Sequence, residues 1–185
     1  KDFSLRSDDF GNLTSLKIKI NMDPCEIGFE SFQGKLEESI INGSFKLEKQ
    51  NPELGFLNNQ SLINLTINKS SFSGKLIKKF ISVPQNFQPL EISFNANGLL
   101  SNLQLNQLIV KNQHLDFAAN LNIENGLSSS FFKVSSNINN LVFTPSNLNY
   151  FLPNSLIEKI PKKLLDYEEV KVFGDVFYEG KSLTT

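Results

Sequence analysis

The sequence contains few of the residues from which catalytic and metal sites are usually built. Its 185 residues include one cysteine, one histidine and no tryptophan. Cys25 has no second thiol, which excludes an internal disulfide and a zinc site made of several thiolates. His114 lies in a polar break between two expected strands, so a nucleophile and its base would have to be built at a hairpin tip. We therefore expect no enzyme activity, no metal site and no cofactor.

Two further features that the sequence does not have narrow the class of protein. The formal net charge is -1, which gives no general attraction to nucleic acid. No apolar run approaches the roughly 18 residues of a membrane span, and no signal peptide opens the chain. Because the chain starts at Lys1 and stops just after a strand-like run, we expect it to be part of a longer protein.

Phenylalanine dominates the aromatic residues, with 17 Phe against 3 Tyr. A phenyl ring has a large apolar surface and no polar atom to satisfy, so this bias suits a dry interior or a hydrocarbon-facing wall better than a sugar- or base-stacking platform. With 39% hydrophobic residues the chain can form a substantial core or apolar surface.

Alternation of apolar and polar residues is the strongest pattern in the chain, and it runs from Leu90 to Phe143. Successive strand side chains point to opposite faces, so this pattern predicts a β meander with one apolar and one polar face. Asn97-Gly98 and Asn125-Gly126 have the composition of hairpin turns. The apolar positions that we single out are Ile92, Phe94, Leu103, Leu105, Phe117, Leu121, Ile123, Val134 and Ile138.

The remainder of the chain is less regular. Residues 1–55 predict irregular strands, and residues 50–61 a loop. Residues 56–143 predict a β meander, whose first strands we expect at Leu62–Asn68 and Phe72–Ile77. The hexamer Ser31–Leu36 recurs with one mismatch at Ser71–Leu76, either by chance or as a sign of stacked β units. Residues 144–166 predict a helical insert that Pro161 kinks or splits. The last strand, in residues 167–185, is apolar on much of both faces, so we expect it to lie under that insert.

Alternation alone leaves the cover of the apolar face open. A second sheet would make an ordinary closed sandwich or β-solenoid, with a structural or adhesive role, and periodicity by itself favours this interpretation. An uncovered face would instead make an open groove.

Several short motifs, taken together and in order, resemble the amino-terminal half of the TamB family of translocation and assembly module proteins in its Bacteroidetes form. They are the Leu-x-Leu-x-x-Leu-x-Val pattern of Leu103–Val110, the strand end Leu121–Gly126, Phe151-Leu152-Pro153, Ile160-Pro161, and the strand Val170–Gly180. The resemblance covers the second half of the chain best.

This resemblance, to the AsmA-like group of bridge-like lipid transfer proteins, implies a mainly β fold: a long, curved, antiparallel sheet forming a taco-like open groove. It implies a periplasmic protein that conducts phospholipid between the inner and outer membranes and supports outer-membrane biogenesis. It also implies an inner-membrane anchor and a region contacting an Omp85-type outer-membrane barrel, both outside this chain. On this hypothesis the nine apolar residues from Ile92 to Ile138 line the groove.

Overall fold

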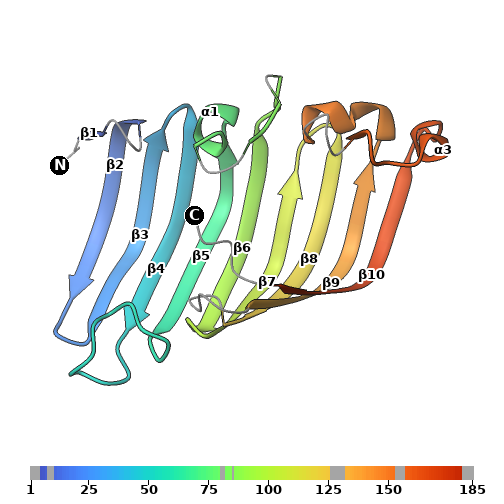
Figure 1. Cartoon of the computed structure of the whole chain (residues 1–185). Helices are drawn as coiled ribbons and strands as arrows, with labels where there is room; N and C mark the ends of the chain where they lie inside the picture. The colour runs from blue at the N-terminus through green and yellow to red at the C-terminus, as the bar shows by residue number, and fades with distance from the viewer. Residues whose placement is uncertain are drawn as a thin grey trace.

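The ten strands of the described residues belong to one antiparallel sheet, in which the order of the strands follows the chain (Figure 1). The computed structural model describes residues 5–7, 11–79, 82–84, 86–125, 132–152 and 157–180, and only the backbone of residues 5–7 and 11–15. The strands are β1 (Leu5–Ser7), β2 (Gly11–Met22), β3 (Glu26–Leu36), β4 (Ser39–Glu48), β5 (Leu62–Phe72), β6 (Leu90–Leu99), β7 (Asn102–Lys111), β8 (Leu115–Glu124), β9 (Phe132–Phe143) and β10 (Val170–Gly180).

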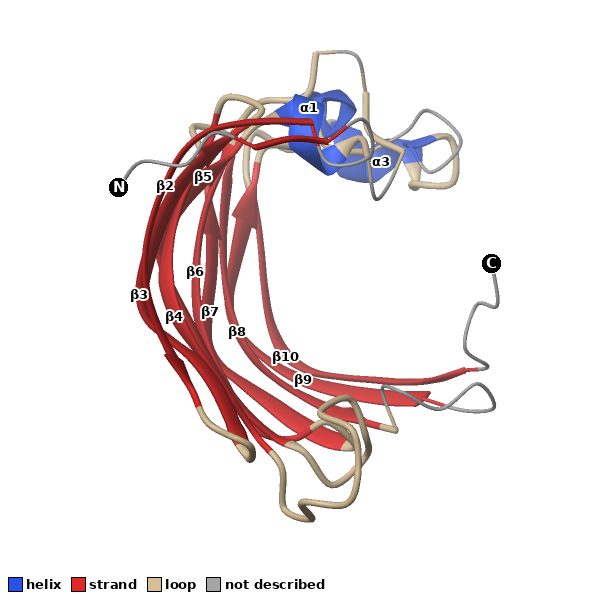
Figure 2. Ribbon diagram, turned by 90° about the vertical axis from the view of Figure 1, so that its left-hand side faces the viewer, coloured by secondary structure: helices blue, strands red, loops and turns tan. Residues whose placement is uncertain are grey.

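The sheet bends into an open, C-shaped cross-section (Figure 2). The pairing register shifts within every neighbouring pair from β2–β3 to β9–β10. Each shift is a bulge, in which extra residues on one strand bend it and increase its twist. A line of bulges across the sheet therefore explains the bend, and the predicted long, curved antiparallel sheet with an open groove is confirmed.

Alternation gives the two faces of the sheet opposite chemistry. In β8, Leu115, Phe117, Ala119, Leu121 and Ile123 share one face because they are spaced two residues apart. Leu115 lines a common hollow with residues of the helical insert, which lies inside the curve in Figure 2, so this face is concave. The convex face carries the polar residues between them.

Short helices lie along one rim of the curve (Figures 1 and 2). Helix α1 (Gly74–Ile77) follows β5, whereas the 3-10 helix η1 (Pro145–Tyr150) and helix α3 (Lys162–Leu165) lie between β9 and β10. Pro161 is the N-cap of α3, so the proline divides the insert as predicted.

Three local predictions are wrong. Asn97-Gly98 is not a turn: Gly98 continues β6 with φ of 124°, and Leu99 still pairs with Asn102 in β7. Only Phe72 of the predicted strand Phe72–Ile77 belongs to a strand, because Ser73 accepts a hydrogen bond from Leu76 N and begins α1. The insert does not cover the last strand, since residues 171–179 of β10 are exposed.

The repeated hexamer does not mark two equivalent units. Ser31–Leu36 lies wholly in β3, whereas Ser71–Leu76 crosses from β5 into α1. Gly126, in the predicted turn Asn125-Gly126, lies outside the described residues. Residues 8–10 and 153–156 also lie outside them.

The closed sandwich is not found in this structure. One sheet accounts for all the strands of the described residues, and no second sheet packs on its concave face.

Candidate functional site

The concave face forms a continuous apolar surface, which we call the trough. Cross-strand pairing places apolar side chains in lines across the sheet, and one such line joins β2 to β10. Its members are Ile20, Phe29, Phe45, Leu65, Ala96, Leu105, Leu121, Ser136 and Val176. The trough is therefore apolar across the width of the sheet, with only Ser136 polar in this line.

The floor of the trough contains its best-covered residues. Ile67 is 7% exposed, Ala96 4% and Ala119 0%. Towards the two edges of the sheet the apolar side chains are more exposed, as with Ile20 at 51% and Val176 at 51%. Hydrocarbon contact is thus available along the whole trough, and the side chains offer few hydrogen-bonding groups.

Two apolar hollows lie in the trough. The first, of about 470 Å³, is lined by Leu16, Ile18, Phe29, Phe32, Phe45 and Leu65. In its lining, the ring centroids of Phe29 and Phe45 are 5.6 Å apart. The second, of about 510 Å³, lies where the insert overhangs the sheet and is lined by Leu115, Leu141, Phe143, Leu148, Phe151, Leu152, Ile160, Pro161 and Leu164.

All nine residues singled out from the sequence lie on the concave face. Leu103 and Val134 are both paired with Ile123, while Leu105 is paired with Leu121. Ile138 is paired with Ala119, and Val110 links Phe117 to Ile92. Phe94 lies two residues from Ile92 in the same strand. Each of the nine is half-buried.

The residues singled out from the sequence do not include the lining from β2 to β5 or from the insert. The signal was present for β2 and β5, since Leu16, Ile18 and Ile20 alternate with lysines and Leu62–Asn68 was predicted as a strand. In β3 it was obscured by the bulge at Glu30 and Ser31, which interrupts the alternation.

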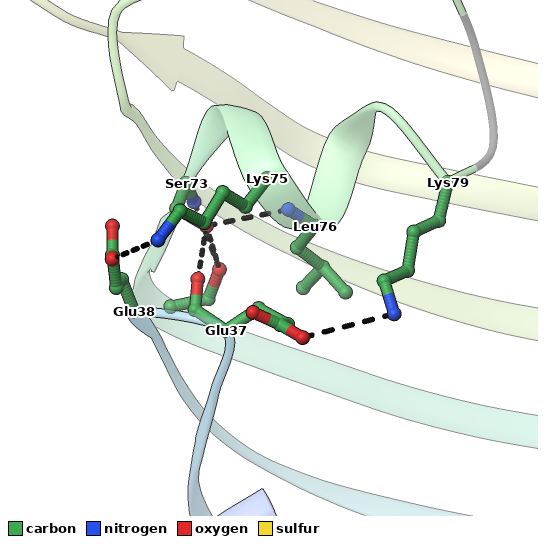
Figure 3. A network of polar contacts seen from close by, with 7 residues as sticks. Glu37, Glu38, Ser73, Lys75, Leu76 and Lys79 are labelled. Carbon is green, nitrogen blue, oxygen red and sulfur yellow. Dashed lines mark hydrogen bonds and ion pairs between the residues drawn. The ribbon is translucent and has the colours of Figure 1, made fainter. Parts of the chain in front are cut away.

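Helix α1 is fastened to the turn between β3 and β4 (Figure 3). Glu37 and Glu38 in that turn have φ of 46° and 67°, a left-handed pair as in hairpin turns of type I′. Ser73 Oγ donates to the carbonyl of Glu37 and accepts from Leu76 N, while Ser73 N donates to Ser39 Oγ at 2.8 Å. We call this set of contacts the rim latch.

Charged side chains reinforce the rim latch. Lys75 is paired with Glu38, and Lys79 Nζ lies 3.8 Å from Glu37 Oε1. The hydrogen bond to Glu38 raises the pKa of Lys75. These residues border the trough but do not enter it.

His114 attaches the helical insert to the turn between β7 and β8. Its ring stacks on Tyr150 with centroids 5.1 Å apart, and Nδ1 lies 3.0 Å from Asn147 Nδ2. Phe151, which lines the second hollow, meets the ring edge-on at 6.5 Å between centroids. These contacts give His114 a positioning role in the insert.

The convex face carries ion pairs within and between strands. Lys46 contacts Glu48 and Glu26, and its hydrogen bonds to these two carboxylates raise its pKa. The pKa of Glu30 is lowered chiefly by its hydrogen bond from Lys19, with a further contribution from Asn21. Both sets keep charge away from the trough.

Other kinds of site are scarce in the described part of the chain. No group of three or more His, Cys, Asp or Glu residues there could hold a metal ion, and Cys25 is a free, half-buried thiol. None of the helices described has the length and apolar character needed to cross a membrane.

Comparison with known proteins places the chain in no family. No family model matches it, and no solved structure does. A stretch of 76 residues is 33% identical to the receptor-like kinase TMK2 of Arabidopsis thaliana. The match covers 40% of this chain and 9% of that protein.

Proposed function

We propose that the trough binds the acyl chains of phospholipids and that this chain is a segment of a periplasmic bridge conducting them between the inner and outer membranes. The observation that carries the proposal is the apolar concave face, which runs from β2 to β10 without a second sheet packed on it in the described residues. An exposed face of this extent needs an apolar occupant, because large uncovered apolar surfaces mark interaction sites.

The energetics favour a conduit of this kind. Exposing one CH₂ group to water costs about 0.8 kcal/mol, so a sixteen-carbon chain costs about 13 kcal/mol to transfer into water. A continuous apolar wall removes most of this barrier. Side chains such as Phe45, Leu65 and Leu121 offer contact without directional hydrogen bonds, so a bound chain can slide.

The wider setting of the proposal comes from the resemblance to the TamB family. It includes the periplasmic location, an inner-membrane anchor outside this chain and an Omp85-type partner in the outer membrane. Fractionation of the source cells with an antibody against this chain tests the location, and recovery in the cytoplasm would contradict it.

A charge placed in the trough tests lipid binding. We expect Leu65→Asp to lower the bound phospholipid at least about fivefold, because an unpaired carboxylate beside an acyl chain is costly to desolvate. Leu65 is half-buried and faces the open first hollow, so the sheet should remain folded by circular dichroism. Bound lipid is measured by extraction and mass spectrometry, and affinity with a fluorescent phosphatidylethanolamine.

The matched control is Asn64→Asp, which adds the same charge one residue away on the convex face. We expect it to bind lipid like the unmodified chain. Unmodified protein that neither copurifies with phospholipid nor binds the fluorescent lipid would overturn the proposal, as would equal lipid binding by both variants.

A further inference from the structure

The convex face carries a shallow cleft that, unlike the trough, is lined by many hydrogen-bonding side chains. It has a volume of about 430 Å³ and spans β7 to β10. Its polar lining consists mainly of amides and hydroxyls, with Asp175 as the one ionisable side chain among the lining residues. Gln104, Asn106, Asn120, Asn122 and Asn137 supply the amides.

These groups lie in two parallel lines across the strands. Gln104 pairs with Asn122, Asn122 with Ser135, and Ser135 with Phe177. In the adjacent line Asn120 pairs with Asn137 and Asn137 with Asp175. Neighbouring strands are about 4.8 Å apart, so hydrogen-bonding groups recur at that interval along the cleft.

One buried polar atom of the cleft has no hydrogen-bond partner, although several of its amides are paired: Gln107 N, for example, donates to Asn120 Oδ1 at 2.9 Å. Asn137 Nδ2 donates to Asp175 Oδ1 at 2.8 Å, and Asn122 Nδ2 donates to Glu124 Oε1 at 3.2 Å. The acceptor Glu124 fixes the orientation of the Asn122 amide, because the reverse orientation would place two oxygens together. Asn122 Oδ1 is covered and has no hydrogen-bond partner, a state that costs about 1–3 kcal/mol. A small rotation of this side chain towards a hydroxyl donor in the cleft would relieve that cost.

An aromatic ring completes the cleft. Phe177 is 65% exposed and lies on the polar face, outside the trough. The exposed ring offers a flat surface for the C–H groups of a ligand, while the amides beside it both donate and accept hydrogen bonds. The composition of the chain as a whole argues against a sugar-stacking platform, but it does not describe this one exposed ring.

The geometry points to a glycan-binding cleft, in which a neutral polysaccharide strand lies across β7 to β10 with a sugar ring against Phe177 and its hydroxyls on the Asn and Gln side chains. Each sugar hydroxyl donates and accepts, which matches amides. The spacing of the strands is close to the advance of one sugar in an extended β-linked glycan. A charged polymer fits less well, since the lining offers no cation and a single carboxylate.

Binding of cellopentaose and of the N-acetylglucosamine pentamer to the full chain tests this inference. We expect binding of one or both by calorimetry, with amide shift changes in NMR spectra confined to the cleft. Phe177→Ala should weaken binding about tenfold, in line with the loss of one stacked ring. Phe173→Ala is the matched control, since Phe173 is 79% exposed in the same strand but does not line the cleft.

Asn137→Ala gives a second test that leaves the aromatic ring in place, and we expect a loss of severalfold. No heat and no shift changes with either glycan at millimolar concentration would overturn the inference, as would equal weakening by Phe177→Ala and Phe173→Ala. Phospholipid binding by these variants should be unchanged, so the outcome is independent of the function proposed for the trough.

Discussion

At the scale of single residues, the bend of the sheet depends on a few small side chains. Ser70 is fully buried in the bulge between β4 and β5, where Oγ accepts from Asn42 N at 2.9 Å and donates to the carbonyl of Asn68 at 2.7 Å. The serine thus satisfies backbone groups that the shifted register leaves without strand partners. Nearby, Gly43 leaves room for the ring of Phe32, its partner in β3.

A methyl group at Gly43 should therefore be costly. It would lie 2.9 Å from Phe32 Cζ and still closer to the carbonyl oxygen of Thr66. We expect Gly43→Ala to lower the free energy of unfolding by about 1–3 kcal/mol, measured by urea denaturation. Gly28→Ala is the control, because the added Cβ would lie 3.4 Å from its nearest atom, Phe45 O. We expect the free energy of unfolding of this variant to stay within about 0.5 kcal/mol of that of the unmodified chain. Equal stability of the two variants would contradict the close packing at the bend.

At the scale of elements, most strands could be predicted from the sequence. The predictions failed where contacts with distant residues determine the local conformation. The alternation in β6 to β9 places the trough residues on one face, and the structure agrees. The hexamers Ser31–Leu36 and Ser71–Leu76 have the same alternation, yet only the first remains a strand throughout. The second turns into α1 because Ser73 meets Ser39 and Glu37, two contacts that no local pattern encodes.

The rim latch yields a prediction for α1. Ser73→Ala removes the N-cap acceptor of Leu76 N and the donor to Glu37, and should cost about 1 kcal/mol or more. We expect faster amide hydrogen exchange in residues 74–79, with the central strands unchanged. Ser71→Ala, two residues earlier in β5, is the control and should exchange like the unmodified chain. If amide hydrogen exchange in residues 74–79 is equally slow in both variants, the rim latch does not stabilise the helix.

At the scale of the whole molecule, the sequence does not predict whether a second layer covers the apolar face. Periodicity identifies which residues share a face, but a closed core and an open trough have the same period. The bulges that bend the sheet are also hard to recognise, because polar pairs such as Glu30-Ser31 and Asn68-Lys69 look like ordinary interruptions. Only the three-dimensional register shows that these interruptions align.

Continuity of the trough can be tested by photocrosslinking. Ile20, Leu65 and Val176 lie in one line across β2, β5 and β10. We expect a photoreactive side chain at each of the three positions to crosslink to a radioactive phospholipid, because the apolar wall extends from one edge of the sheet to the other. Asn21 and Asn64, on the convex face, serve as controls and should not label. Labelling confined to one of the three strands would indicate an isolated pocket.

The aligned bulges also determine how smooth the inner wall is for anything that travels along it. Every strand pair from β2 onward carries a register shift, so the wall is bent across its whole width and no strand pair leaves it flat. A flexible guest displaced by one strand, about 4.8 Å, meets apolar side chains again. Movement from one strand to the next therefore exchanges one apolar contact for another, without a step through water.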